Sequence, residues 1–458
     1  MNLRTIGSIF LAGVFLAGCA AIRDAHTAQA ESGDSLPPGE RSATAEEMGL
    51  RSGETLTLAD AIAISLKWNP AMAIATQNLA SAQIALHQAG VSQRPTLSGS
   101  VGYSESYSRS EMTDGWEKQS NDAFNYGLSL SWTLVDFGQT AAARRRAAAQ
   151  YAAAAEAYRN AGIQRIAQVR VAYLSLGQAE NLCVISMESL DRYKLLLKQA
   201  ELKLQIGTGK KYDVTKARVD CSNAALSLIN ASNAVLTARA TLNSQLGLAQ
   251  PVDYRIADLH NTKSVGLAIP SPLTAEVLLE FARTNQPALM MSQAQVRAAS
   301  AAVDAAVAAL YPNLSLSGSL STSTAEPVVY SANWGASFVK SLFSGWGKRD
   351  ALRQSVVALR IARANLAQQE QQMLYDITSA IAARDTAQQS LRATNALREQ
   401  AWENLELVLK QFDLGTSSIL DRSDAQLAYT QANINRGNAV YGHEIAIVKL
   451  NAILGLYE

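Results

Sequence analysis

The 458-residue chain is poor in the residues that most chemical functions require. It has three cysteines and four histidines, and the histidines are scattered at positions 26, 87, 260 and 443. No Cys-x-x-Cys pair or His–Cys spacing suggests a metal site. No nucleophile–base set or phosphate-binding glycine loop is visible. The sequence therefore predicts no catalytic residue, metal or soluble cofactor, and an enzyme such as an envelope hydrolase is the least favoured class.

The chain also lacks net charge, aromatic residues and proline. A net charge of +1 gives no electrostatic reason to expect nucleic acid as a partner. Only 6% of residues are aromatic, and alanine is in excess, which favours helices. No proline interrupts residues 139–206 or 348–414. These stretches predict two helices of roughly 100 Å. They are too long and polar to lie in a bilayer, and they need coiled-coil-like packing.

Long hydrophobic runs are absent apart from Ile6–Ala17, which follows Arg4 and is too short for a permanent membrane helix. The run leads into Leu16-Ala17-Gly18-Cys19. This resembles the bacterial lipoprotein signal, which implies a signal peptide over 1–18. It also implies N-acyl and S-diacylglycerol groups on Cys19. The alternative is ordinary secretion with cleavage after Ala30, beyond an awkwardly long charged run.

By the same resemblance, alanine at position 20 favours the outer membrane over retention at the inner one. Residues 19–53 are polar, with Pro37-Pro38-Gly39 and scattered serine and glutamate. This composition predicts a flexible tether between the lipid and the folded body.

What the chain has in abundance is internal repetition. Pro70 and Pro95 correspond to Pro287 and Pro312, both at an offset of 217 residues. Further along, Gly207-Thr208 corresponds to Gly415-Thr416, and Leu246-Gly247 to Leu454-Gly455, both at an offset of 208. We therefore predict a first repeat at 54–247, a linker at 248–270 and a second repeat at 271–458.

Within each repeat, a period of two follows the second proline. The apolar residues of the first repeat alternate with serine, glycine, asparagine and threonine over 96–135, interrupted by a predicted polar loop at about 109–121. The second repeat has the same pattern at about 313–343, less regularly because Lys340 falls in phase with Trp334 and Phe338. One-faced, aromatic-rich strands of this kind are a weak signature of a membrane β-barrel. A soluble hairpin packed on a core is the alternative, which the lipoprotein signal and the long helices disfavour.

Each long helix is predicted to end at a glycine turn, at Gly207 and at Gly415, because glycine suits the left-handed conformation that closes a helix. A returning helix then completes a helical hairpin. Cys183 lies 24 residues before Gly207 and Cys221 lies 14 after it, so the two are out of register by roughly 15 Å. A disulfide between them is not expected.

Four strands per chain cannot close a barrel, and open sheet edges are not tolerated against lipid. Single-chain barrels begin at eight strands. The chain must therefore oligomerise, and three copies in a closed ring would supply twelve strands.

One order of elements occurs twice in the chain: a short helix, an Asn-Pro or Gln-Pro helix, a β-hairpin, a long helix, a Gly-Thr turn and a returning helix. Over about 54–458, this doubled order resembles the outer membrane efflux protein family, the TolC-like channel-tunnels. Cys19 makes it similar to the lipidated subgroup that serves tripartite efflux pumps. The resemblance implies a mainly α fold with a small transmembrane β part. It implies a homotrimer with a helical α-barrel and a twelve-stranded β-barrel, anchored in the outer membrane and extending into the periplasm.

The implied function is a passive export duct. Its implied partners are a periplasmic adaptor, an inner membrane transporter and outer membrane lipid. The alternative is a periplasmic, lipid-anchored coiled-coil adaptor or spacer without a pore, which does not explain the apolar faces of the β-hairpins.

The resemblance also points to residues at the helical tips. Asp421 and Asp424 match acidic positions that form rings at the periplasmic entrance, which implies a gate. Alternatively, they are ordinary charges at a helix N-terminus. Where a family member has an arginine and a tyrosine that hold the tip closed, this chain has Ser417 and Phe412, so Arg422, Lys210 or Lys211 are candidate substitutes. The residues expected at the tip turns and in tip contacts are Gly207, Thr208, Asp213, Phe412, Gly415 and Thr416.

Overall fold

The computed structural model describes residues 44–456 except 45, 51–52, 113–114, 249, 251, 253, 258–273, 325–328, 341–342, 344 and 415. The predicted signal peptide, Cys19, most of the tether and Gly415 lie outside the described residues. The helices are α2 (Leu58–Trp68), α3 (Pro70–Gln88), α4 (Gln139–Gln205), α5 (Lys211–Leu246), α6 (Ala275–Asn285), α7 (Pro287–Ala308), α8 (Gly347–Asp413) and α9 (Ile419–Ile453). The strands are β1 (Thr55–Leu56), β2 (Thr96–Met112), β3 (Gly115–Val135), β4 (Arg255–Ile256), β5 (Asn313–Ser323) and β6 (Val329–Val339).

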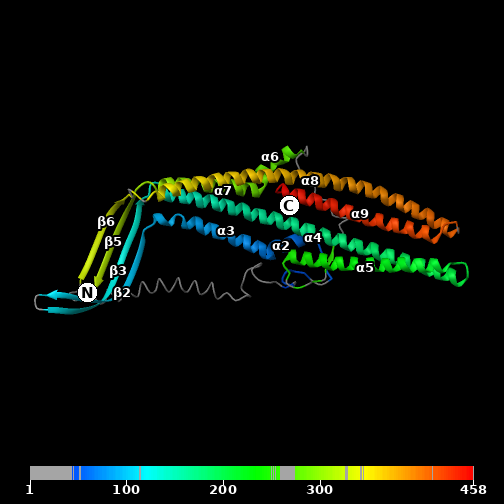
Figure 1. Cartoon of the computed structure of the whole chain (residues 1–458), viewed down its shortest axis with the longest axis horizontal. Coiled ribbons are helices and arrows are strands. Elements are labelled where there is room, and N and C mark those ends of the chain that lie inside the picture. Colours follow the sequence, from blue (N-terminus) through cyan, green and yellow to red (C-terminus); the bar gives the residue numbers. More distant parts are fainter. Residues whose placement is uncertain are drawn as a thin grey trace. The chain divides into compact units, whose positions relative to one another are not determined.

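The order of elements from α2 to α5 recurs from α6 to α9 (Figure 1). Both long helices have 67 residues, and the returning helices have 36 and 35. Pro70 and Pro287 each occupy the first helical position, where the missing N–H costs nothing. The chain divides into two compact units, one made of residues 78–155 and 291–367, the other of the remaining described residues.

The first unit contains a four-stranded antiparallel sheet in the order β2-β3-β5-β6. The register aligns apolar residues directly, as in Val101↔Tyr126 and Leu128↔Leu320. On the opposite face serines and glycines pair, as in Ser98↔Ser129. The apolar face is exposed in the single chain, with Trp334 88% exposed. The sheet thus has one apolar and one small polar face, and its edge strands are β2 and β6.

Two predictions about the hairpins were wrong in detail. The polar loop at 109–121 is mostly strand, because β2 continues to Met112 and β3 begins at Gly115. Backbone hydrogen bonds carry the antiparallel ladder past the point where the apolar alternation ends, so side-chain periodicity could not detect it. In the second hairpin, β6 runs over Val329–Val339, so the hairpin ends before the predicted limit of about 343. Lys340 therefore lies beyond the strand and does not disturb its pattern.

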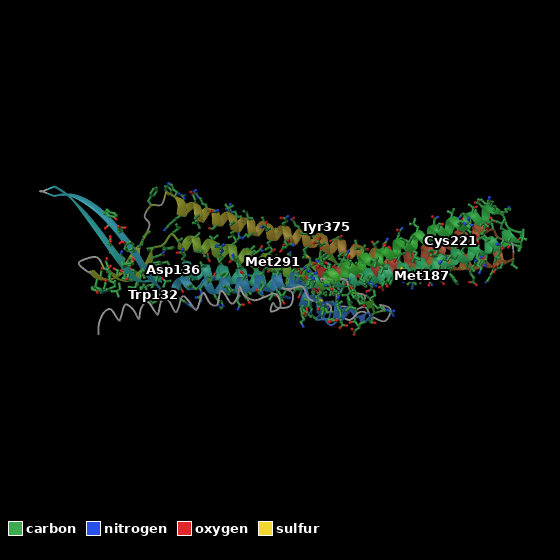
Figure 2. All side chains as sticks on the ribbon, turned by 90° about the horizontal axis from the view of Figure 1, so that it is seen from below. Trp132, Asp136, Met187, Cys221, Met291 and Tyr375 are labelled. Atoms are coloured by element: carbon green, nitrogen blue, oxygen red, sulfur yellow. The ribbon has the colours of Figure 1, made fainter. Side chains whose placement is uncertain are left out.

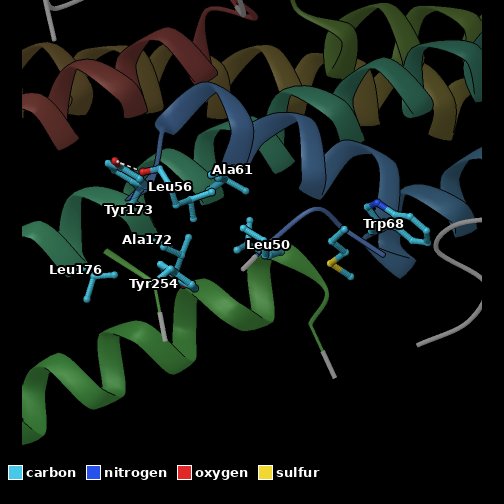
Figure 3. Close-up of a cluster of buried hydrophobic side chains, with 12 residues drawn as sticks. Leu50, Leu56, Ala61, Trp68, Ala172, Tyr173, Leu176 and Tyr254 are labelled. Carbon is cyan, nitrogen blue, oxygen red and sulfur yellow. Dashed lines mark hydrogen bonds between the residues drawn. The ribbon is translucent and has the colours of Figure 1, made fainter. Parts of the chain in front are cut away.

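The second unit contains two helical hairpins, α4–α5 and α8–α9, each covered by a short helix (Figure 1). In the first core, the Tyr173 hydroxyl donates to the Leu56 carbonyl at 2.9 Å and accepts from the Ala257 N–H at 3.0 Å (Figure 3). This ties the parallel β1–β4 pair to α4. The fully buried residues of the two cores are Ala61, Val169, Leu176, Leu242 and Leu246 in the first, and Leu278, Ala282, Ile377, Leu450 and Leu454 in the second.

None of the helices in the described part of the chain is both long enough and apolar enough to cross a membrane.

Candidate functional site

The two tip turns close their helices in the same way. The Thr208 N–H and hydroxyl both donate to the Lys203 carbonyl, at 3.0 and 3.2 Å. The Thr416 N–H and hydroxyl donate to the Gln411 carbonyl at 2.9 and 3.1 Å. Gly207 has the predicted left-handed conformation, with φ at +82°. These bonds satisfy the last carbonyls of α4 and α8, which is how a helix is stopped without a proline.

Both aspartates six residues after the tip glycines cap the returning helices. The Asp421 carboxylate accepts the Ser418 N–H at 2.9 Å, while the Asp421 N–H donates to the Ser418 hydroxyl at 3.1 Å. Asp213 accepts the Lys210 N–H at 3.4 Å. Hydrogen bonds from the Ser418 side chain and backbone hold the pKa of Asp421 below its ordinary value. Asp421 therefore has a capping role.

Asp424 is different because its side chain is exposed and forms no hydrogen bond or ion pair with the described residues. It lies one turn beyond Asp421 on α9. Its charge helps raise the pKa of the Tyr193 phenol to about 12, after burial and Asp220. Of the two predicted gate residues, Asp424 is the one whose carboxylate is not engaged locally.

A phenylalanine ring contacts two cations where the hairpins meet. Lys203 Nζ is 4.1 Å and Arg422 Cζ is 4.8 Å from the centre of the Phe412 ring, which is 8% exposed. Arg422 Nη1 also donates to Gln199 Oε1 at 2.6 Å. Burial lowers the pKa of the Arg422 guanidinium, and Asp413 opposes that shift; the group stays charged at neutral pH. Phe412 thus contributes a cation–π acceptor, and Arg422 joins α9 to α4.

A second contact joins α5 to α9. Lys216 Nζ donates to the Asp220 carboxylate at 2.6 and 2.7 Å, and the Ser423 hydroxyl donates to Asp220 Oδ2 at 2.6 Å. The Lys216 and Asp220 side chains are 28% and 13% exposed. Partial burial reduces solvent screening, so this pair is stronger than an exposed one. Ser423 also lies beside the buried Tyr193, whose phenol pKa it lowers against the larger effect of burial.

We call Tyr193, Gln199, Lys203, Lys216, Asp220, Phe412, Arg422 and Ser423 the tip clasp, because together they join the first helical hairpin to the second. Of these, only Phe412 and Arg422 were singled out from the sequence. The spacing of four residues between Lys216 and Asp220 could have predicted an ion pair on one helix. It could not predict the contact of Asp220 with Ser423, which lies 203 residues further along the chain. The other two candidate cations lie at the start of α5, where Lys210 is the N-cap residue and Lys211 the first helical residue. Neither has a side-chain contact with the second hairpin among those of the described residues.

The model of the outer membrane efflux protein family matches residues 61–248 and 278–456. The chain belongs to the outer membrane efflux protein family.

Two relatives illustrate the family's range. The outer membrane protein OprJ of Pseudomonas aeruginosa is 26% identical over 367 residues, covering 75% of this chain and 72% of that protein. The probable outer membrane lipoprotein SilC of Salmonella typhimurium is 21% identical over 345 residues, covering 74% of each. Among solved structures, the Campylobacter jejuni CmeC outer membrane channel superposes with a TM-score of 0.77 at 20% identity. That superposition covers 87% of this chain and 85% of that one.

Among the described residues, no group of three or more His, Cys, Asp or Glu side chains could hold a metal ion. Cys183 and Cys221 are both free thiols. Cys221 lies on α5, and Figure 2 shows it in the same hairpin as Met187 of α4. The tips, with the clasp and Asp424, are therefore the family member's best candidate for a functional site.

Proposed function

We propose that this family member is the outer membrane channel of a tripartite efflux or secretion system, and that it acts as a passive duct gated at its periplasmic helical tips. The observation that carries this proposal is the four-stranded sheet with one exposed apolar face and two edge strands. An even number of antiparallel strands lets β6 of one copy pair antiparallel with β2 of the next. Three copies then give a closed, twelve-stranded barrel with no edge exposed to lipid.

The remaining parts of the proposal follow from membership of the family. A homotrimer forms the duct, a periplasmic adaptor and an inner membrane transporter dock on its tips, and solutes leave without chemical change. Cys19 carries the lipid, a role that the sequence supports through its Leu-Ala-Gly-Cys run and that the lipoprotein relative makes reasonable.

The gate is proposed to combine two parts. The tip clasp holds the hairpins of each copy together, and Asp424, with Asp421 behind it, brings at least three carboxylates from three copies near the axis. Such a ring attracts cations and repels itself unless it is held. Loosening the clasp would let the tips move apart.

Conductance in planar lipid bilayers tests the proposal. The purified chain should form discrete channels, and the double variant Asp421→Ala, Asp424→Ala should show higher single-channel conductance with less block by divalent cations. Absence of any channel from correctly folded protein would favour the periplasmic spacer instead. Channels whose conductance is unchanged by the double variant would remove the gate assignment while leaving the duct.

A further inference from the structure

Positive charge is concentrated at one end of the four-stranded sheet. The starts of β2 and β5 and the ends of β3 and β6 lie together at this end, where the strands join the helices (Figure 1). The segments 89–95, 136–150, 304–312 and 340–353, which surround it, contain eight basic and three acidic residues. The whole chain, in contrast, has a net charge of only +1.

The three acidic residues at this end are all engaged. Asp304 is paired with Arg145 at 3.0 Å, and Asp350 with Arg353 at 3.2 Å. Asp136 is buried, and its carboxylate accepts a hydrogen bond from the first turn of α4. Six cations therefore have no acidic partner among the described residues. We call them the basic collar: Arg94, Arg144, Arg146, Lys340, Lys348 and Arg349.

Exposed aromatic rings accompany the basic collar. Phe137 and Trp346 have φ of +51° and +67°, a conformation that residues with a Cβ rarely adopt. Their side chains are nevertheless 49% and 63% exposed, so burial does not offset the strain. Strained residues of this kind cluster at functional positions. Exposed rings beside polar groups are favourable at the boundary between a membrane and water.

Two contacts join the basic collar to the apolar face of the sheet. Trp132 belongs to that face, and its Nε1 donates to the Gln93 carbonyl at 2.9 Å. This contact brings Arg94, the next residue, beside the apolar face. Arg144 lies against the same turn of the chain, because a Cβ on Gly90 would be 3.1 Å from Arg144 Nε. The cations of the first hairpin therefore border the surface that meets lipid in the proposed barrel.

The second hairpin repeats this combination of a ring and a cation. Arg349 Cζ is 5.6 Å from the centre of the Trp346 ring, which orients the guanidinium beside an exposed aromatic surface. The exposed Phe343 ring meets the same Trp346 ring edge-on, with centres 6.1 Å apart. Lys340 directly follows the last residue of β6. Both hairpins thus place cations next to exposed rings at the helix end of the sheet.

The basic collar lies at the depth of lipid headgroups when the sheet spans a bilayer. Strands β5 and β6 have 11 residues each, or roughly 36 Å at about 3.3 Å per residue. With a tilt of about 45°, they match the apolar band of about 25 Å that outer membrane barrels present. Arg146 lies seven residues into α4, or roughly 10 Å beyond the strand ends. A headgroup layer is about 5–8 Å thick.

The sign of the charge differs between the two ends of the sheet. Residues 104–112 and 115–123, at the end away from the helices, contain four acidic and two basic residues. The cations are therefore confined to the helix end. In the proposed channel the helices extend into the periplasm, so the basic collar lies in the periplasmic leaflet of the outer membrane.

We propose that the basic collar binds the phosphate groups of anionic phospholipids, such as phosphatidylglycerol, in that leaflet. Guanidinium and ammonium groups donate to the phosphate oxygens, and the acyl chains follow the apolar face of the sheet. A zwitterionic lipid carries its own ammonium and gains less from the cations. This inference rests on the proposed channel and adds the class of lipid that surrounds its periplasmic edge.

Lipid selectivity of the purified full chain tests this proposal. The chain in detergent is mixed with equal amounts of phosphatidylglycerol and phosphatidylcholine that have the same acyl chains. The lipids that stay bound through gel filtration are then measured by mass spectrometry. We expect the natural chain to retain phosphatidylglycerol preferentially. Lys348→Gln with Arg349→Gln should lower the ratio of the two lipids at low salt, by roughly fivefold or more, because each basic residue near an anionic surface contributes about that factor.

Arg360→Gln with Arg363→Gln is the matched control. Both arginines are exposed on α8 but lie roughly 20–25 Å from its start, beyond the headgroup layer. Lys348→Arg with Arg349→Lys keeps both charges and should keep the preference. An equal loss from the collar pair and the control pair, or a loss from the charge-preserving swap, would overturn the basic collar as a lipid site.

Two further measurements separate the alternatives. In chains extracted directly from outer membranes, the collar pair should lower the co-purified phosphatidylglycerol and leave lipopolysaccharide unchanged. The reverse would place these cations in the outer leaflet and overturn the assignment. Bilayer conductance of the same samples separates this inference from the proposed function. Channels without a preference for phosphatidylglycerol would overturn the basic collar alone, and a preference without channels would overturn the duct alone.

Discussion

At the scale of single residues, this chain holds its tip with different chemistry from the arginine and tyrosine expected from the family. Phe412 cannot donate a hydrogen bond, but its face accepts two cations, from Lys203 and Arg422. The hydrogen-bonding part is taken over by Lys216, Asp220 and Ser423. Lys216 and Asp220 belong to the first hairpin and Ser423 to the second. The Lys216–Asp220 ion pair therefore joins the two hairpins only through Ser423.

The charge of Asp220 can be tested directly. Asp220→Asn keeps the shape but weakens hydrogen bonds to a charged group, each worth about 1.5–3 kcal/mol. We expect a lower melting temperature and a higher channel conductance. Glu406→Gln is the matched control, because the Lys410–Glu406 pair has the same spacing of four residues but side chains that are 68% and 51% exposed. An equal effect of both variants would show that partial burial of the Asp220 pair is unimportant.

Tyr193 makes the tip sensitive to alkali. Burial first, and then Asp220 and Asp424, raise the pKa of its phenol to about 12 in the folded chain, against about 10 when unfolded. The stabilisation from the neutral phenol is therefore complete below pH 10 and is lost as the pH rises towards 12. The full loss is on the order of 2 kcal/mol.

Melting curves between pH 8 and 11.5 should show a steeper alkaline decline for the natural chain than for Tyr193→Phe. The comparison is needed because burial also raises the pKa values of Tyr173 and Tyr254. Parallel declines would mean that Tyr193 titrates normally in the folded chain.

At the scale of elements, the sequence predicted the helix boundaries that proline and glycine determine. Proline at the start of α3 and α7 marked where those helices begin, and the proline-free stretches located the two long helices within one residue at each end. The hairpin ends were missed because the residues beyond Tyr107 no longer alternate, although the ladder continues. The clasp was missed because it depends on which helix faces fall together across about 200 residues, and side-chain pattern on one helix does not contain that information.

The strand-to-helix junctions carry backbone strain that the sequence did not reveal. Among the described residues, Phe137 and Trp346 are the non-glycine residues with positive φ, at +51° and +67°. Both sit at the matching junctions, Phe137 between β3 and α4 and Trp346 before α8; Figure 2 labels the neighbouring Asp136. A left-handed conformation costs a residue with a Cβ roughly 1–2 kcal/mol.

Phe137→Gly should relieve that strain while losing the stacking of Phe137 on Tyr311, whose ring centres are 5.9 Å apart. We expect it to be neutral within about 1 kcal/mol, since the two effects oppose each other. Phe137→Val, which loses the ring and adds branching at Cβ, should lower the melting temperature clearly. A glycine variant as unstable as the valine variant would mean that the ring contact outweighs the strain.

At the scale of the whole molecule, the imperfection of the repeat decides which contacts are locked. The offset of 208 carries Lys216, Asp220 and Ser423 onto Asp424, Ala428 and Thr215. Within the chain these positions form an ion pair with a hydroxyl. The equivalent positions carry a carboxylate that is exposed, a methyl group and a hydroxyl. The lysine–aspartate part of the clasp therefore does not recur at the positions that the offset makes equivalent.

Restoring the symmetry tests the effect of this difference. Asp424→Lys with Ala428→Asp would place a second lysine–aspartate pair on α9, at the positions equivalent to Lys216 and Asp220. In the proposed homotrimer, this pair is expected to bind the Thr215 hydroxyl of a neighbouring copy, as the first pair binds Ser423, and so to lower conductance. Asp424→Lys alone removes the same carboxylate and adds the same cation without an acceptor, so it isolates the effect of charge on the pore. If the single and double variants have equal conductance, the added pair does not reach the neighbouring copy. A double variant whose conductance recovers when Thr215 is also changed to Val would locate the new contact at that hydroxyl, because valine keeps the shape and removes the hydrogen bond.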